Sequence, residues 1–309
     1  MSNFLDILRR NYRPIVMILT MCFGVLLHRP LTLLDSAANH QLAPAFIFAM
    51  LYVTFCRVKV SELRFSMMHV WLLLFQVAAS IAVYHLLLPV DGIIAQGAFI
   101  CFLTPIAMGA VVIGGLLGAN IASLATFTLF SNCVIALIAP YLLAEYGNGL
   151  CTFPQIMARV APLLILPFLL AQISRALVRP FSDWVSNHSF ISFYLWLVSL
   201  FVTLGRTTSY ILNYDGEAST LEQISLAGVA LLACVIQFAL GRVIGHRYGD
   251  AVVGGQGLGQ KNTVLAVWLA HSFLTPISSV APTAYIIWQN IANSLQLYIH
   301  DRKANKKSQ

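Results

Sequence analysis

The sequence has 309 residues, of which 59% are hydrophobic and only 9% are Asp, Glu, Lys or Arg. Soluble domains carry about 25% charged residues, and a soluble fold cannot cover this much apolar surface. The net charge of +7 does not indicate a nucleic-acid-binding protein, because the basic residues stand in short clusters between apolar runs. Composition therefore predicts a protein embedded in lipid, with the bilayer as its surroundings and no nucleic acid as a partner.

Only helices and closed barrels satisfy the backbone hydrogen bonds inside a bilayer, and long unbroken apolar runs favour helices. A helical span needs about 20 mostly apolar residues. In chain order the predicted spans are 13–29, 42–57, 65–89, 94–117, 120–144, 156–178, 187–212, 222–245, 250–273 and 276–299. We therefore expect an all-α membrane protein with ten transmembrane helices in a single transmembrane domain over 1–309, ending in a polar, disordered cytoplasmic tail over 301–309.

The distribution of basic residues tests this topology independently. The predicted outer segments contain Arg29, Arg159 and Arg206. The predicted cytoplasmic segments contain Arg9, Arg10, Arg13, Arg57, Lys59, Arg64, Arg175, Arg179, Arg242, Arg247, Arg302, Lys303, Lys306 and Lys307. This asymmetry predicts a multi-pass protein of the cell (inner) membrane with both termini cytoplasmic. Ten spans also divide into two five-helix halves of opposite orientation, the arrangement of inverted-repeat transporters.

The ninth predicted span contains the strongest local signal. Residues 254–259 include four glycines, and Gln260, Lys261, Asn262 and Thr263 follow them. Non-helical backbone at membrane depth is tolerated only beside protein or a water-filled cavity, so an interrupted span indicates a transporter binding site. Close helix packing through glycine is the alternative interpretation.

Lys261 is the most informative residue of this span. It lies eleven residues beyond Asp250, which is about 16 Å along a helix and near the bilayer midplane. A cation at that depth costs about 2.5–3.5 kcal/mol and usually marks a pathway or a relay. We expect carbonyls, amides, water or an anionic substrate as its partners, because no Asp or Glu is predicted at that depth. The alternative is a structural lysine held by backbone carbonyls at the helix break.

The fourth predicted span is the counterpart of the ninth. Pro105 removes a backbone hydrogen bond and kinks or breaks the helix, although an ordinary proline kink remains an alternative. Each interrupted span is the fourth of its half, so we expect the two to form one site. Other embedded polar residues suit helix–helix hydrogen bonds as well as ligand binding. They are Gln76, Thr128, Ser131, Asn132, Gln237, Gln289, Asn290, Asn293 and Ser294.

An enzyme is not expected from this sequence. Acidic residues such as Asp35 and Asp91 fall almost entirely in predicted loops, and no catalytic set lies at membrane depth. The six cysteines are scattered without CxxC or Cys/His spacing, so we predict no metal site and no cofactor.

Residues in both interrupted spans also carry a family resemblance. They are Gly259-x-x-Asn262, Ala270-His271, Pro276, Pro282 and Trp288-x-Asn290, and the spacing from Pro105 through Ala119-Asn120 to Pro140. This pattern resembles the bile acid:sodium symporter (BASS) family, of which the chain looks like a divergent bacterial member. The resemblance implies a panel part over 13–57 plus 156–212 and a core part over 65–144 plus 222–299. In the core part, broken helices 4 and 9 would cross.

The resemblance also exposes a departure at the positions that match the family's sodium ligands. Gly257 stands where the family has a Glu, and Lys261 stands where it has a Gln. Ala110 and Val111 stand where it has a Ser and an Asn, and Leu124 where it has another Ser. Thr128 and Gln76 keep polar ligand types. With Pro105, Leu258 and Gln260, these positions make up the implied crossover and ion-site equivalents. We expect Lys261 to occupy the place of the cation as a tethered charge, so that transport does not need sodium. Proton coupling stays open, because a desolvated lysine can lose its proton.

The predicted function is transport of a small organic anion by alternating access. The candidate substrate-binding residues are Lys261, Asn262, Thr263, Gln289 and Asn290. Lys261, Asn262 and helix N-terminal ends at the crossover would favour negative charge. The alternatives are a sodium-coupled symporter with altered ligands, a metalloid or auxin-type carrier of related fold, and a transporter-like sensor without transport.

Overall fold

The computed structural model describes residues 12–56, 58, 61, 63–107, 109–188, 190–212 and 220–307. These residues form helices joined by short connections, with one isolated β-bridge and no strand among them. The prediction of an all-α protein is confirmed for this part of the chain. Four helices are long and apolar enough to cross a membrane, and three shorter helices are also apolar, as expected of a membrane-embedded protein.

The first half of the chain follows the predicted spans with two differences. Its helices are α2 (Tyr12–Leu26), α3 (His28–Ala37), α4 (Leu42–Phe55), α5 (Met67–Leu87), α6 (Gly92–Leu103), α7 (Gly109–Leu116) and α8 (Ile121–Tyr146). The predicted span 94–117 consists of two helices, α6 and α7, as the proline suggests. The segment that becomes α3 is predicted as a connection, because it is short and carries no long apolar run. Its Pro30 lies in the first turn, where a proline is tolerated.

The second half also contains one helix that the apolar runs do not predict. Its helices are α9 (Phe153–Leu177), α10 (Arg179–Asn187), α11 (Phe190–Leu212), α12 (Thr220–His246), α13 (Ala251–Gly259), α14 (Thr263–Phe273), the 3₁₀-helix η2 (Pro276–Ser279) and α15 (Val280–Lys307). The unpredicted helix is α10, which occupies the expected connection after 156–178. The predicted ninth span is interrupted, and α13 and α14 lie on the two sides of the break.

The predicted disordered tail over 301–309 is wrong for most of its length, because α15 continues to Lys307. Lys, Arg and Ala have high helix propensity, and cations near a helix C-terminus are stabilised by the helix dipole. Outside the described residues lie Ser308, Gln309 and four basic residues of the topology argument, Arg9, Arg10, Arg57 and Lys59.

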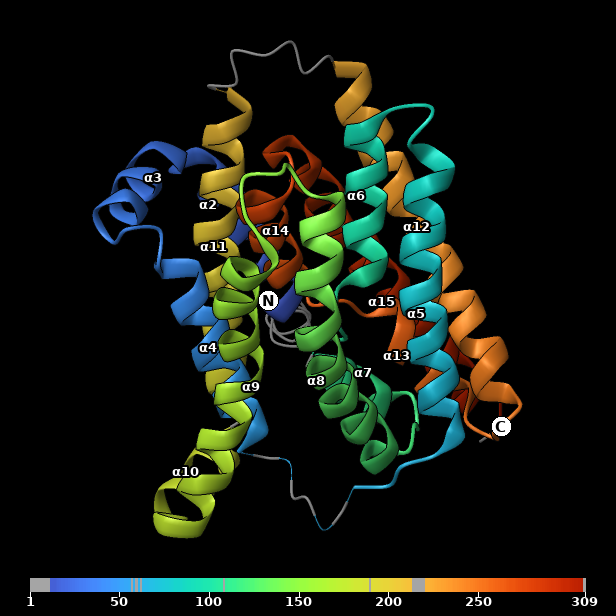
Figure 1. Ribbon diagram of the computed structural model, residues 1–309. Helices are drawn as coiled ribbons and strands as arrows, with labels where there is room; N and C mark the ends of the chain where they lie inside the picture. The colour runs from blue at the N-terminus through green and yellow to red at the C-terminus, as the bar shows by residue number, and fades with distance from the viewer. Residues whose placement is uncertain are drawn as a thin grey trace, which may run out of the picture.

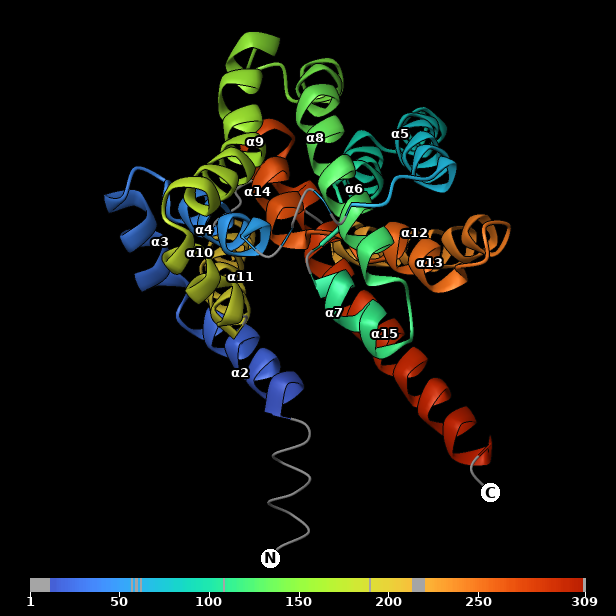
Figure 2. The same ribbon diagram turned by 90° about the horizontal axis from the view of Figure 1, so that it is seen from below.

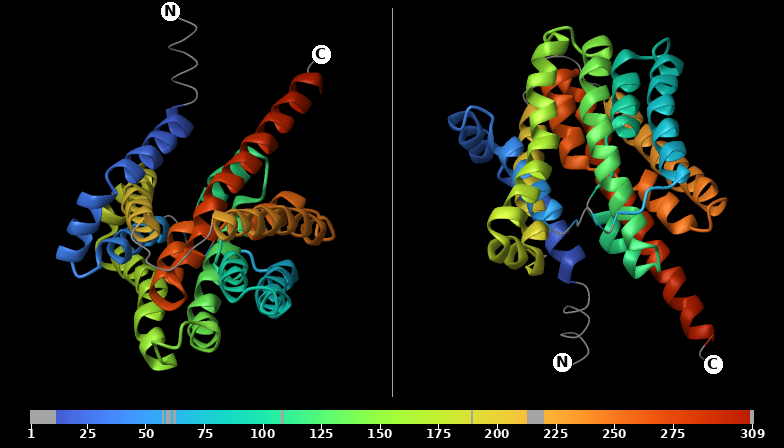
Figure 3. Two further views of the ribbon diagram at one scale, coloured as in Figure 1. Left: turned by 90° about the horizontal axis from the view of Figure 1, so that it is seen from above. Right: turned by 60° about the horizontal axis from the view of Figure 1, so that its bottom comes forward.

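Two groups of helices lie beside each other (Figure 1). Seen from below, α2, α3, α4, α9, α10 and α11 gather on one side, and α5, α6, α7, α12, α13 and α15 on the other (Figure 2). Two helices link the groups, because α8 packs on α9, and α14 packs on α4, α11 and α6. The carboxyl-terminal part of α15 extends away from the rest of the protein (Figure 3).

A buried ion pair ties α3 to α11. Asp35 is 0% exposed, and its Oδ2 lies 3.1 Å from Nε of Arg206 and 2.7 Å from Nδ1 of His40. The pair is enclosed because α3 approaches α11 closely, where a Cβ on Gly205 would come within 2.9 Å of Cβ of Leu31. The sequence predicts a loop at Asp35, whereas the residue lies in α3 and its carboxylate is buried.

Candidate functional site

The two interrupted spans meet at their breaks. The N–H of Ala107 donates to the carbonyl of Gln260 at 2.8 Å, and the N–H of Asn262 donates to the carbonyl of Pro105 at 3.0 Å. These bonds form the antiparallel bridge, so two non-helical segments far apart in sequence satisfy each other's backbone groups. This pairing is how non-helical backbone becomes tolerable deep inside an apolar protein.

Local chemistry explains where each break falls. Pro105 has no N–H to continue the hydrogen bonding of α6, and the hydroxyl of Thr104 donates to the carbonyl of Ile100 at 2.6 Å. On the other span, Asn262 is the N-cap of α14, and its Oδ1 accepts from the N–H of Leu265 at 3.2 Å. Proline and asparagine therefore stop one half-helix and start another.

Side chains from outside α6 donate to the carbonyls of its last three residues and of its C-cap, Thr104, where a helix has no partners of its own. The pairs, donor first, are Gln237 Nε2 to Cys101 (3.2 Å), Lys261 Nζ to Phe102 (3.0 Å), and Gln76 Nε2 to both Leu103 (2.7 Å) and Thr104 (3.0 Å). The carboxyl end of α6 is thus capped by α12, α5 and the break between α13 and α14.

Lys261 is held at this capped end. The residue is 1% exposed, and its N–H donates to Oε1 of Gln289 at 3.0 Å while its ammonium donates to the carbonyl of Phe102. Within the described residues no ion pair includes Lys261, since the acidic partners found there, Asp35 and Asp183, pair elsewhere. The negative end of the α6 dipole favours a cation at this place. Of the partners that the sequence leaves open, the structure supplies a backbone carbonyl.

Tyr285 belongs to the same cluster and is missed by sequence reasoning. It is 1% exposed, its hydroxyl donates to the carbonyl of Gly259 at 2.9 Å, and it accepts from Nε2 of Gln237 at 3.1 Å. The amide of Gln237 therefore links the carboxyl end of α6 directly, and that of α13 through the hydroxyl of Tyr285. A tyrosine inside an apolar run carries no local sign of this contact, although its embedded hydroxyl is a signal that could have found it.

The amino end of α14 offers unpaired donors. Asn262 is 3% exposed and Thr263 is 2% exposed, and neither Nδ2 of Asn262 nor Oγ1 of Thr263 has a hydrogen-bond partner among the described residues. Both lie where the first N–H groups of a helix create a positive end. These two predicted substrate-binding residues are therefore buried, and each has a hydrogen-bond donor that the described residues do not use.

A ladder of amide side chains leads away from the break along α13 and α15. Nδ2 of Asn293 donates to Oε1 of Gln260 at 2.7 Å, and Nε2 of Gln256 donates to Oδ1 of Asn293 at 3.2 Å and to Oε1 of Gln296 at 3.3 Å. Arg242 completes the ladder by donating to Oε1 of Gln296 at 2.6 Å. Each link orients the next, so the half-exposed Arg242 and the break belong to one connected network.

The glycines of α13 mainly serve close packing. A Cβ on Gly254 would overlap the carbonyl oxygen of Gly241 and come within 2.8 Å of Cα of Gly245, so α12 and α13 touch backbone to backbone. A Cβ on Gly259 would overlap the ring of Phe238. These glycines therefore serve close helix packing. This role is compatible with an interrupted span, because the break lies directly after them.

The remaining implied site residues contribute little polar chemistry to the break. Ala110, Leu124 and Leu258 are 0% exposed and apolar. Val111 is partly buried, and a Cβ on Gly257 would come within 3.0 Å of the ring of Phe127. Two polar members bond within their own helices, Thr128 Oγ1 to Leu124 O (2.8 Å) and Asn290 Nδ2 to Ile286 O (2.6 Å).

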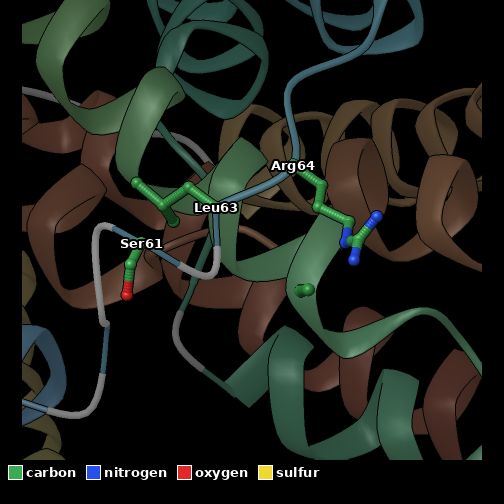
Figure 4. A pocket seen from close by; sticks show the side chains of 4 residues that line it. Ser61, Leu63 and Arg64 are labelled. Atoms are coloured by element: carbon green, nitrogen blue, oxygen red, sulfur yellow. The ribbon is translucent and has the colours of Figure 1, made fainter.

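A separate hollow of about 480 Å³ opens near the start of α8, with Ser61, Leu63, Arg64 and Ala122 in its described lining (Figure 4). Arg64 is fixed there through its N–H, which donates to Oγ1 of Thr126 at 2.8 Å. None of the predicted site residues belongs to this lining.

Comparison with known proteins gives no relative from which a role could be transferred. No protein-family model matches the chain, and no curated protein matches its sequence. The resemblance to bile acid:sodium symporters therefore stays a prediction.

Proposed function

We propose that this chain is a secondary transporter that moves a small organic anion across the cell membrane by alternating access, without sodium. Its fold would be a divergent form of the bile acid:sodium symporter fold, with ten spans in two inverted five-helix repeats. The observation that carries the proposal is the buried ammonium of Lys261 at the meeting point of two interrupted spans. Intramembrane ionisable groups at broken helices are typical of transport sites.

Matching local structure in the two interrupted spans supports the repeat. Oδ1 of Asp91 caps α6 by accepting from the N–H groups of Ile93 and Ile94, and Oδ1 of Asp250 caps α13 by accepting from Val253. In one span, α6 with 12 residues is followed by a break and by α7 with 8 residues. In the other, α13 with 9 residues is followed by a break and by α14 with 11 residues. The helix group that contains α4, α9 and α11 would then be the panel part. The group that contains α5, α6 and α12 would be the core part.

A tethered cation accounts for independence from sodium. Hard cations need several oxygen ligands, and Ala110, Leu124 and Gly257 have no side-chain oxygen. The carbonyl of Phe102 is already bonded to the Lys261 ammonium, and Gln76 occupies the next two carbonyls. Lys261 would provide from within the chain the positive charge that the end of α6 favours.

The amino end of α14 supports an anionic solute. Asn262 Nδ2 and Thr263 Oγ1 are donors without a partner in the part of the chain that the structure describes, and they stand beside the positive end of a helix. A carboxylate or sulfonate accepts from such donors and is stabilised by the helix dipole. The ammonium of Lys261, on the adjacent residue, adds positive potential there.

The proposal is tested by uptake into proteoliposomes, with a bile salt and a panel of carboxylate metabolites as probes. We expect at least one anion to be taken up equally when sodium is replaced by choline. Asn262→Asp should abolish this uptake, because the variant keeps an N-cap oxygen but replaces the amide donors with a repelling carboxylate. Asn148→Asp, at a half-buried position away from the break, is the control.

Three outcomes would change the conclusion. A strict sodium requirement contradicts the role given to Lys261. Unchanged uptake by Asn262→Asp contradicts the placement of the anion at α14. Thermal stabilisation of the wild type by an anion that is never taken up would identify a sensor instead of a transporter.

A further inference from the structure

Helix α10 follows α9 directly, and Figure 2 shows it turned out of line with α9. One side of α10 packs on the protein, since Ser182 and Val185 are 1% and 4% exposed and the helix contacts α9 and α4. A helix of this length would not be stable alone in water, so these contacts hold it in place.

A second side of α10 carries an aromatic stack that the described protein leaves half uncovered. Phe181 is 49% exposed and Trp184 is 52% exposed, and their ring centroids are 6.4 Å apart with an interplanar angle of 16°. The ring of Trp184 also lies 4.5 Å from that of His188. Residues at i and i+3 share one side of a helix, so the stack forms a continuous surface.

An apolar stripe on α9 precedes this surface along the chain. Leu166, Leu170, Ile173 and Leu177 are 44%, 42%, 50% and 79% exposed, and their spacing puts them on one face of a helix of 25 residues. Because α9 is long and apolar enough to cross a membrane, such a stripe suits contact with acyl chains. The stripe ends at Leu177, two residues before α10 begins, so the aromatic stack lies where α9 leaves the hydrocarbon.

We propose that α10 lies in the membrane–water interface and binds the headgroup region of the bilayer through Phe181 and Trp184. Tryptophan gathers at this level because its ring is apolar and its N–H is polar. A third side of α10 faces water and headgroups, with Arg179 and Asp183 paired at 3.7 Å and 81% and 60% exposed in their side chains. The inference requires a membrane-embedded protein but does not depend on transport.

The test uses the full chain in phosphatidylcholine vesicles whose acyl chains carry bromine, a quencher of tryptophan fluorescence, either near the ester or near the methyl end. The signal of Trp184 is the difference between wild type and Trp184→Phe. We expect most of this signal to be lost with bromine near the ester and little to be lost with bromine near the methyl end. Trp268, which is 7% exposed, is the control, and its difference signal should survive both lipids.

Quenching of the Trp184 signal by neither lipid would mean that water, a second copy of the chain or another protein covers the stack, and the proposal would be wrong. Stronger quenching from the methyl end would place α10 inside the hydrocarbon and would also overturn it. As a second measurement, Phe181→Ser with Trp184→Ser should lower the melting temperature in lipid nanodiscs but not in detergent micelles, which cover apolar surface at any depth. An equal loss in both would indicate internal packing and contradict the proposal.

Discussion

The ammonium of Lys261 donates to a single backbone oxygen among the bonds described, in a part of the protein closed to solvent. Lys261→Met shortens the unbranched side chain by one heavy atom and removes both donor and charge, which leaves the carbonyl of Phe102 without this partner. We expect a loss of about 1–3 kcal/mol in unfolding free energy, measured as a lower melting temperature in nanodiscs. Arg247→Met, at an exposed position, is the control and should change little. A more stable Lys261→Met would show that burying the charge costs more than its bond contributes.

Asp35 and Arg206 are the second place where charge is enclosed. Asp35→Asn removes the negative charge but keeps the shape, so Arg206 is left with an uncompensated charge. We expect a loss of about 3 kcal/mol, at the lower end for buried pairs because the Arg206 side chain keeps 19% exposure. Combining Asp35→Asn with Arg206→Met should restore most of the melting temperature. Additive losses in the double variant would mean that the two side chains do not act as a pair.

At the scale of elements, the backbone contact between α12 and α13 sets how closely the interrupted span can lie against its neighbour. Gly254→Ala introduces a Cβ that overlaps the carbonyl of Gly241, and relieving the overlap should cost about 1–3 kcal/mol. Gly228→Ala, in α12 with open space around it, should instead stabilise the helix by about 0.5–1 kcal/mol. Thermal melts of the two variants should shift in opposite directions. Equal shifts would exclude close packing as the reason for the glycine.

The sequence predicts both breaks because their causes are local. Pro105 removes the N–H that α6 would need to continue. The glycines lower helix propensity ahead of Gln260, although they lie within α13 and the break follows them. The sequence does not predict the partner of Lys261, because the carbonyl of Phe102 has no side-chain signature and lies 159 positions away. Helix α10 is missed for another reason. It is stabilised by Ser182 and Val185, which pack on the protein, and a short amphipathic segment between two apolar runs cannot be told from a connection in the sequence.

For the whole molecule, the proposed ten spans require both ends of the chain on the cytoplasmic side. Alkaline phosphatase is active only outside the cytoplasm, so a fusion at the carboxyl terminus should be inactive. A fusion after Gly149, in the predicted outer connection between α8 and α9, should be active. Activity at the carboxyl terminus would place that end outside the cytoplasm and would contradict the proposed topology.

The hydrogen bond from Lys261 to Phe102 also bears on the order of biosynthesis. Half-helices of 9 and 11 residues are each too short to anchor themselves in a bilayer, and the second of them starts two residues after a cation. The acceptor lies on the amino-terminal side, so the ribosome delivers it well before its donor emerges. Each nascent chain can therefore present a finished docking place to the segment that carries its buried cation, and α13 and α14 would depend on the earlier half for stable insertion.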